Sequence, residues 1–169
     1  MDTRTTPAYR TISNHIIAEM RQKLSNNQNA LFVLRSYRPG EAIADFSAGT
    51  ISAEPTYLTV QVGIARHITL QPEFLQYINH SCNPNVFFDT SSMRLVALKE
   101  LRPEDELTFF YPSTEWKMEQ PFNCYCGYPG CLGQIKGAAY LSKNAREKYR
   151  LTDFIQQQLA KRPARKKVA

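Results

Sequence analysis

Four cysteines constrain this 169-residue chain more than any other feature of its sequence. Cys124, Cys126 and Cys131 follow one another in the spacing C-x-C-x4-C, and Cys82 lies about 40 residues upstream. Cysteine thiolates bind Zn²⁺ tetrahedrally, and a structural zinc site usually has four protein ligands. The set therefore predicts one structural Zn²⁺ bound by all four cysteines. Free buried thiols and disulfides are the alternatives, and the lack of a secretory signal argues against disulfides.

The segment around the cysteines needs such a constraint. Residues 112–133 show little hydrophobic periodicity and contain proline, glycine and cysteine throughout, so they have few apolar side chains to bury. The whole chain is 43% hydrophobic and 21% charged, which is typical of a folded domain with a core and excludes global disorder. No apolar run reaches the roughly 20 residues that a membrane-spanning helix needs.

The charge is distributed unevenly along the chain. The net charge is +6, and residues 140–169 carry nine Lys or Arg and two Asp or Glu, so the first 139 residues are close to neutral. The basic run 161–167 predicts a solvated tail, with a nuclear-import signal or a nucleic-acid contact as alternatives. The N-terminus lacks the basic-then-apolar layout of a secretory signal. We therefore expect an intracellular protein, cytoplasmic or nuclear, that does not bind membranes.

Hydrophobic patterning predicts short strands in the middle of the chain and helices at its ends. We expect strands at 31–34, 42–46, 57–64, 86–88, 94–98 and 106–111. Ile12, Ile16 and Met20 recur at helical spacing, so residues 9–26 are predicted to form a helix with Ser13 as a candidate N-cap. A second helix is predicted over 141–159.

Two further motifs combine polar or aromatic side chains in a way that suggests a site. Residues 77–85 are rich in asparagine, histidine, serine and cysteine but lie between apolar stretches, and buried amides and imidazoles need hydrogen-bond partners. The strand 106–111 ends in aromatic residues, with Tyr111 directly before a proline. Taken singly, the first motif also fits an asparagine- and proline-rich loop, and Tyr111 also fits a core side chain.

Together, the three motifs resemble the SET-domain methyltransferases. The residues that carry the resemblance are Asn79-His80-Ser81-Cys82-x-Pro84-Asn85, then Glu106-Leu107-Thr108-Phe109-x-Tyr111, and then the post-SET cluster Cys124-x-Cys126-x4-Cys131. The resemblance covers about residues 30–135. It implies a mainly β fold of small curved sheets with a knot-like core, flanking helices and a post-SET zinc loop. The expected divisions are an N-terminal helical extension (1–29), the SET domain (30–111), the post-SET zinc-binding segment (112–139), and a C-terminal helix with the basic tail (140–169).

The resemblance also implies a chemistry. It implies S-adenosylmethionine as the methyl donor and, as the usual acceptor, a lysine exposed on a protein such as a histone. Tyr111 matches the active-site tyrosine, whose hydroxyl would orient the amine and the methyl group. Asn79 and His80 match residues that contact the cofactor, and Leu132 matches a position that packs on the adenine.

The remaining matched positions include three departures from the family pattern. Gln28-Asn29-Ala30 stand where the family has Gly-x-Gly, Phe46 stands where it has tyrosine, and Gln76 stands where it has arginine. Phe46 and Phe109 are expected to line the substrate channel, and phenylalanine at 109 leaves room for more than one methyl group. Close backbone approach to a cofactor is easiest for glycine. A binding module without transfer activity and an enzyme acting on a small molecule are therefore the alternatives to a protein-lysine methyltransferase.

Overall fold

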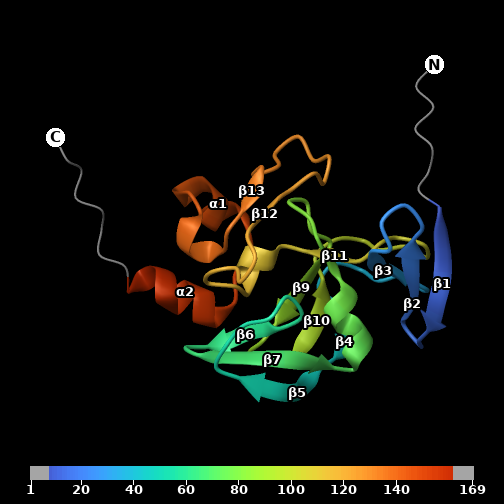
Figure 1. Cartoon of the computed structure of the whole chain (residues 1–169), viewed down its shortest axis with the longest axis horizontal. Helices are drawn as coiled ribbons and strands as arrows, with labels where there is room; N and C mark the ends of the chain where they lie inside the picture. Colours follow the sequence, from blue (N-terminus) through green and yellow to red (C-terminus); the bar gives the residue numbers. More distant parts are fainter. Residues whose placement is uncertain (1–7, 162–169) are drawn as a thin grey trace.

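The computed structural model describes residues 8–161, which form mainly short β-strands with two α-helices at the C-terminal end (Figure 1). The strands are β1 (Tyr9–Asn14), β2 (Ala18–Lys23), β3 (Asn29–Val33), β4 (Ala42–Asp45), β5 (Ser47–Ser52), β6 (Val60–Gly63), β7 (Arg66–Gln71), β8 (Asn79–His80), β9 (Val86–Asp89), β10 (Arg94–Ala97), β11 (Thr108–Phe109), β12 (Phe122–Asn123) and β13 (Gln134–Ile135). The helices are α1 (Lys143–Lys148) and α2 (Asp153–Ala160), with 3₁₀ turns η1 (Glu73–Tyr77), η2 (Tyr111–Ser113) and η3 (Ala138–Tyr140). None of these helices is long and apolar enough to cross a membrane.

Three antiparallel sheets of three strands form the body of this region. Their strand orders are β1-β2-β3, β4-β10-β9 and β5-β7-β6, and the pairs β8–β11 and β12–β13 complete the β-structure. The pair β8–β11 is parallel and places Asn79 opposite Thr108 and His80 opposite Phe109. The predicted fold class, small β-sheets with flanking helices, is confirmed.

Hydrogen bonds from the turn after β8 stabilise the parallel pair β8–β11. The Asn85 side chain donates to the main-chain oxygen of Glu106 (2.8 Å) and accepts from the main-chain N–H of Thr108 (2.8 Å). The main-chain N–H of Ser81 donates to the oxygen of Phe109 (3.0 Å). These bonds join the two sequence motifs, 79–85 and 106–111, directly in the fold.

The helix predicted over residues 9–26 is wrong. These residues form the hairpin β1–β2, and β2 pairs with β3. The helical spacing of the apolar residues was misleading because Ile16 is 92% exposed in the hairpin turn and Ile12 is 43% exposed. Pairing with the buried strand β3 fixes the segment as a strand, since tertiary context outweighs a local pattern. The N-terminal extension is therefore β-structure over its described part.

The helix predicted over 141–159 is interrupted. Ser142 caps α1 by accepting from the Ala145 N–H (3.2 Å), and Thr152 caps α2 by accepting from the Ile155 N–H (3.4 Å). Tyr149, between the two helices, has extended backbone and is buried. A second N-cap inside the apolar pattern thus divides one predicted helix into two.

The C-terminal helices and the residues between them pack on Phe110, which lies between β11 and Tyr111. Phe110 stacks on the Tyr149 ring, with 3.7 Å between ring centroids, and lies in one apolar cluster with Leu141 and Ile155. The Tyr149 hydroxyl donates to the main-chain oxygen of Cys82 (2.7 Å). The C-terminal segment therefore contacts both motif segments, next to the cysteine cluster.

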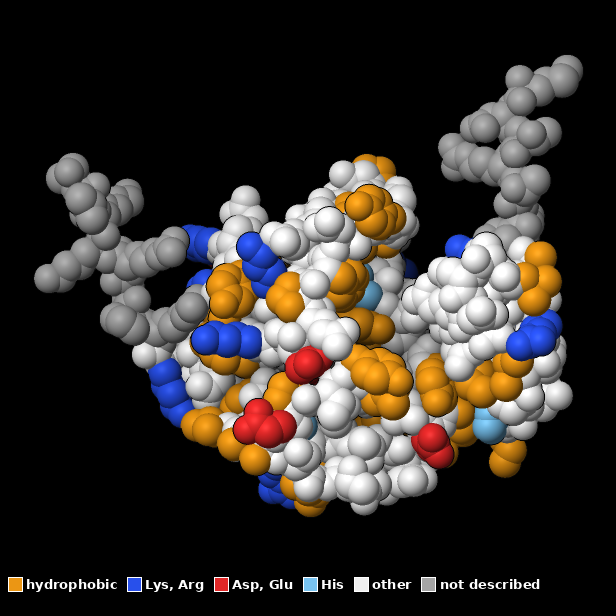
Figure 2. All heavy atoms as spheres, viewed as in Figure 1, with side chains coloured by type: hydrophobic (Ala, Val, Ile, Leu, Met, Phe, Trp, Pro, Cys, Tyr) orange, Lys and Arg blue, Asp and Glu red, His pale blue; other side chains and the backbone are white. Residues whose placement is uncertain are grey.

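The uneven charge of the sequence is visible on the surface. Figure 2 shows Lys and Arg side chains gathered on the side of the molecule where Figure 1 places α1 and α2. The basic tail lies outside the described residues beyond Lys161. Its expected solvation and its alternative roles stay predictions.

Tyr149→Phe tests the link between the C-terminal segment and Cys82. The variant keeps the stacked ring but leaves a buried carbonyl without its donor, which costs about 1–2 kcal/mol. We expect a fall in melting temperature of roughly 2–8 °C, measured by circular dichroism. Tyr140→Phe is the control, because the Tyr140 side chain is 60% exposed. Equal melting temperatures for both variants and the wild type would contradict the link.

Candidate active site

A cavity of about 520 Å³ lies where the motif segments meet. Its size is typical of sites for small molecules and cofactors. The walls come from segments distant in the sequence: 28–29, 56–60, 75–79, 109–111 and 115–122 all contribute. The cavity therefore depends on the packing of the whole domain.

Tyr111 lies in the cavity wall, at the start of η2. Its ring packs against Phe109 (centroids 4.6 Å apart) and Phe122 (5.9 Å). Its hydroxyl donates to the main-chain oxygen of Ile78 (3.3 Å). Burial raises the pKa of Tyr111 to about 12, so the hydroxyl keeps its proton at neutral pH.

His80 connects Tyr111 to the cysteines. Its Nδ1 accepts from the Tyr111 main-chain N–H (3.3 Å), and its Nε2 lies 3.4 Å from the Cys82 sulfur. Burial lowers the pKa of His80 to about 4, so the ring is neutral and carries its hydrogen on Nε2, facing the sulfur. His80 does not line the cavity. Its observed contacts are those of a bracing residue, and its expected contact with a cofactor stays a prediction.

Asn79 lines the cavity, and its side chain is bonded within the protein. Its Nδ2 donates to the main-chain oxygen of Asn29 (2.9 Å) and to a carboxylate oxygen of Glu106 (3.1 Å). Its Oδ1 accepts from the Gln28 side chain (3.0 Å). Asn79 thereby ties the start of β3, and Gln28 just before it, to the parallel pair. Gln28, which stands where the family pattern has its first glycine, and Asn29 form part of the cavity wall.

Of the two aromatic residues expected in the substrate channel, one lines the cavity and the other packs behind the cavity wall. Phe109 lines the cavity. Phe46 does not: it packs edge-on against Phe88 (5.4 Å), and Phe88 in turn lines the cavity and contacts Phe109 (4.8 Å). Phe46 directly follows β4 and is buried in the core, where it is 5% exposed. Its expected place in the substrate channel stays a prediction.

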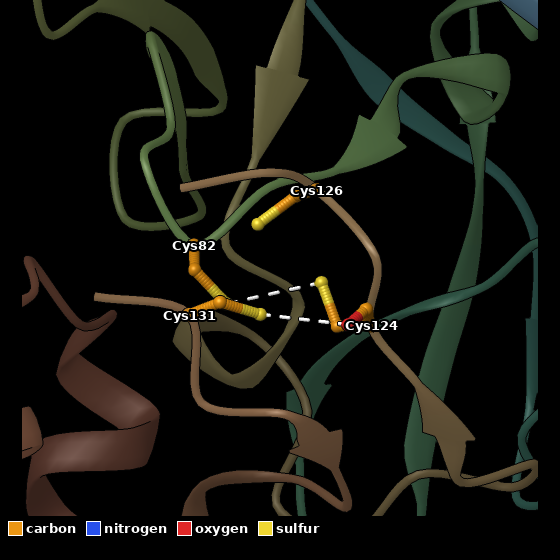
Figure 3. Close-up of side chains that lie close together, drawn as sticks. All are labelled: Cys82, Cys124, Cys126 and Cys131. Carbon is orange, nitrogen blue, oxygen red and sulfur yellow. Dashed lines mark hydrogen bonds between the residues drawn. The ribbon is translucent and has the colours of Figure 1, made fainter. Parts of the chain in front are cut away.

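The four cysteines converge although their segments are distant in the sequence (Figure 3). Their sulfur atoms all lie within 4.8 Å of one another, and Cys82 Sγ is 3.9 Å from the sulfurs of both Cys124 and Cys131. A tetrahedral site with metal–sulfur bonds of about 2.3 Å requires sulfur separations of about 3.8 Å. The set therefore fits a tetrahedral metal ion.

Main-chain N–H groups point at these sulfurs. The Leu132 N–H donates to Cys82 Sγ (3.4 Å) and the Gly133 N–H donates to Cys131 Sγ (3.4 Å), as is common around metal-bound thiolates. Burial raises the pKa of the Cys82 thiol to about 11, so metal binding must displace protons. The Leu132 side chain is 38% exposed and does not line the cavity. Its contact with an adenine stays a prediction.

One carboxyl group in the cavity wall had no signal in the sequence. Glu115 lies within the irregular segment 112–133, is 8% exposed and lines the cavity. Its Oε1 accepts from the Gln61 main-chain N–H (2.9 Å) and the Thr114 hydroxyl (3.1 Å). Burial raises the pKa of Glu115 to about 7. A single glutamate in a segment without periodicity gives no pattern from which its burial could be read.

Comparison with known proteins decides the family. A model of the SET domain matches residues 44–112, which include β8, β11 and Tyr111. The methyltransferase flvH of Aspergillus flavus is 40% identical over 123 residues, covering 72% of this chain and 68% of that protein. The chain belongs to the SET-domain methyltransferase family.

Other relatives of this SET-domain protein match a smaller part of their own length. The H3 lysine-36 specific histone-lysine N-methyltransferase of Aspergillus oryzae is 33% identical over 107 residues, which are 55% of this chain and 11% of the relative. The histone-lysine N-methyltransferase TRX1 of Oryza sativa subsp. japonica is 29% identical over 86 residues, or 47% and 8%. The shared part of these two relatives is about a tenth of each.

Asn79→Asp tests whether this side chain ties the cavity wall together. Aspartate loses both N–H donors and places a carboxylate beside Glu106, so we expect a loss of about 1–3 kcal/mol of unfolding free energy at neutral pH. The two carboxylates repel each other only when both are ionised. The destabilisation is therefore present at neutral and high pH and is relieved as the pH falls and the pair takes up a proton. Urea denaturation from pH 4 to 8 measures it.

Gln28→Ala serves as the comparison, because it removes one of these bonds and adds no charge. It should cost less and show the wild-type pH dependence. An Asn79→Asp protein with wild-type stability throughout the pH range would mean that these contacts do not hold the wall.

Proposed function

We propose that this protein transfers methyl groups from S-adenosylmethionine to the side-chain amine of a lysine on a protein. The proposal rests chiefly on the Tyr111 hydroxyl, which stays protonated in the wall of a cavity large enough for a cofactor and a side chain. Membership of the SET-domain methyltransferase family supports the reaction class. The histone-lysine relatives support a protein substrate of histone type.

Tyr111 would orient the attacking nitrogen. S-adenosylmethionine supplies a methyl group on a sulfonium, which is a good leaving group. Because the Tyr111 hydroxyl donates to Ile78, its oxygen can accept from an amine N–H and hold the nitrogen lone pair in line with the methyl group. The aromatic wall of Phe88, Phe109 and Phe122 would exclude water around the reacting atoms. A phenyl ring at 109 brings no hydroxyl into this space, which favours more than one methyl transfer.

The cysteine cluster would bind one Zn²⁺ with a structural role. Cys82, Cys124, Cys126 and Cys131 would be its ligands, and the ion would hold the segment around β12 and β13 on the turn after β8. Met118 and Phe122 of that segment line the cavity, so the ion would shape the site without taking part in the reaction. His80, Leu132 and Gly133 would support the sulfurs through their N–H groups.

The acceptor is the open part of the proposal. The methyltransferase flvH of Aspergillus flavus, which aligns over 68% of its own length, is named without a substrate. The acceptors to be tested are therefore core histones, a lysine-containing peptide library and a metabolite extract, with methyl groups counted by mass. A nuclear or cytoplasmic location and any contact of the basic tail with nucleic acid stay predictions from the sequence.

Tyr111→Phe tests the mechanism. The variant keeps the ring and its packing, so cofactor binding measured by calorimetry should change little. Loss of a positioning hydroxyl in a dry site should slow methyl transfer by ~10²-fold or more. Tyr140→Phe, on η3 away from the cavity, should keep wild-type activity. Tyr111→Phe with lower stability but unchanged activity would identify a core tyrosine, and wild type that binds no S-adenosylmethionine at millimolar concentration would identify a binding module.

A further inference from the structure

Glu115 is held next to Tyr111 by the main chain. It lies two residues after the end of η2, and its main-chain N–H donates to the Tyr111 main-chain oxygen (3.1 Å). Its own main-chain oxygen accepts from the Ala138 N–H (2.8 Å), at the start of η3. Both side chains line the same cavity. The main chain of Glu115 is therefore held on two sides by bonds within the protein.

The two carboxyl oxygens of Glu115 have different surroundings. Oε1 accepts both hydrogen bonds, from Gln61 and Thr114. Oε2 accepts no hydrogen bond from residues 8–161. In that range, two side-chain polar atoms have no partner and are also closed off from solvent, namely His67 Nδ1 and Ser113 Oγ. Oε2 is not among these sealed atoms. An oxygen that is neither bonded nor sealed keeps some accessible surface, and the side chain that carries it lines the cavity. Oε2 is thus available to a ligand.

No cation within the described chain compensates this carboxyl group. None of the ion pairs among residues 8–161 includes Glu115. The other titratable side chains that line the cavity are Tyr57, Tyr77, Tyr111 and Glu119. His67 lies opposite Gln61 on β7, and burial lowers its pKa, which favours the neutral ring. A buried carboxylate without a partner favours a cationic ligand, and burial alone accounts for the raised pKa of Glu115.

We propose that Glu115 is the group that accepts the proton of the substrate ammonium before methyl transfer. The proposal rests on the proposed function, because only an amine substrate brings such a proton. An ammonium has no lone pair and cannot attack a methyl group, so a proton must leave first. Glu115 offers an open oxygen in the same cavity as the hydroxyl that would orient the amine.

The proposed reaction has two steps, a proton transfer and then a methyl transfer. An N–H bond of the substrate ammonium breaks and an O–H bond forms at Glu115 Oε2, giving a neutral amine and a neutral carboxylic acid. The amine lone pair then forms the bond to the methyl carbon, while the electron pair of the carbon–sulfur bond goes to sulfur and leaves a neutral thioether. The proton on Glu115 returns to solvent after the product has left.

This role predicts a particular pH dependence. The carboxyl group accepts a proton only when ionised, so kcat/KM should rise with pH through about 7 and then level off. In Glu115→Gln the plateau above pH 7 should disappear. The activity of the variant should instead recover toward pH 10, where the free amine becomes available without a base, since a lysine amine has a pKa near 10.4 in water.

The test compares Glu115→Gln with wild type on the best acceptor found among histones, peptides and metabolites. Glutamine can accept the same two hydrogen bonds, so the fold and S-adenosylmethionine binding should be retained, while transfer at pH 7 falls by ~10²-fold or more. Glu147→Gln, on the exposed side of α1, is the control. A second readout is the side-chain carboxyl carbon signal of Glu115 in ¹³C,¹⁵N-labelled wild type, assigned through its connectivity to the backbone signals of Glu115. This signal should titrate near pH 7.

Each outcome decides the proposal. Loss of transfer at pH 7, together with a pH-dependent rise that continues toward pH 10 without a plateau, supports it. Wild type that methylates an amine while Glu115→Gln does so equally well, or more slowly with the same pH profile, overturns it and leaves the proposed function intact. A Glu115 signal that titrates near pH 4 also overturns it, even if the variant fails to fold. Wild type that methylates no amine overturns the proposed function and this proposal together.

Discussion

The convergence of four sulfur atoms is the constraint on which the rest of the site depends. The segment that supplies three of them has only the two-residue strands β12 and β13 and a small apolar cluster around Ile135. Such a segment cannot bury enough surface to fix itself. A metal ion held by Cys82 and the three later cysteines would supply the missing free energy, because ligands dispersed in the unfolded chain meet only in the folded one.

The cluster is connected to the reacting groups through short contacts. His80 lies between the Cys82 sulfur and the main chain of Tyr111, and Tyr149 holds the Cys82 carbonyl from the other side. Glu115 is bonded to the main chain of Tyr111 as well. The cysteine cluster, Tyr111 and Glu115 are therefore connected through these hydrogen bonds. A structural ion that takes no part in the reaction would still influence activity through them.

The sequence predicted those parts that involve polar groups with specific partners. The resemblance to the SET-domain family predicted that Asn79, His80 and Tyr111 lie together, and the spacing of the cysteines predicted a shared metal site. Prediction from the sequence failed where the only pattern was the spacing of hydrophobic residues. Residues 9–26 have helical spacing but pair with β3, and the 141–159 helix is divided by the Thr152 cap. Glu115 gave no signal, because its burial is produced by β6 and η3, which are distant in the sequence.

Amide hydrogen exchange, measured before and after removal of the metal, tests the central role of the cysteine cluster most directly. Protein purified without a metal-affinity tag should contain one Zn²⁺ per chain by elemental analysis. After chelation, amide exchange should accelerate over residues 118–135 and at the β8–β11 pair, and S-adenosylmethionine binding should weaken, while the β4-β10-β9 sheet keeps its protection. Protein without bound metal that has the same exchange pattern and binds S-adenosylmethionine equally well would contradict the central role of the cysteine cluster.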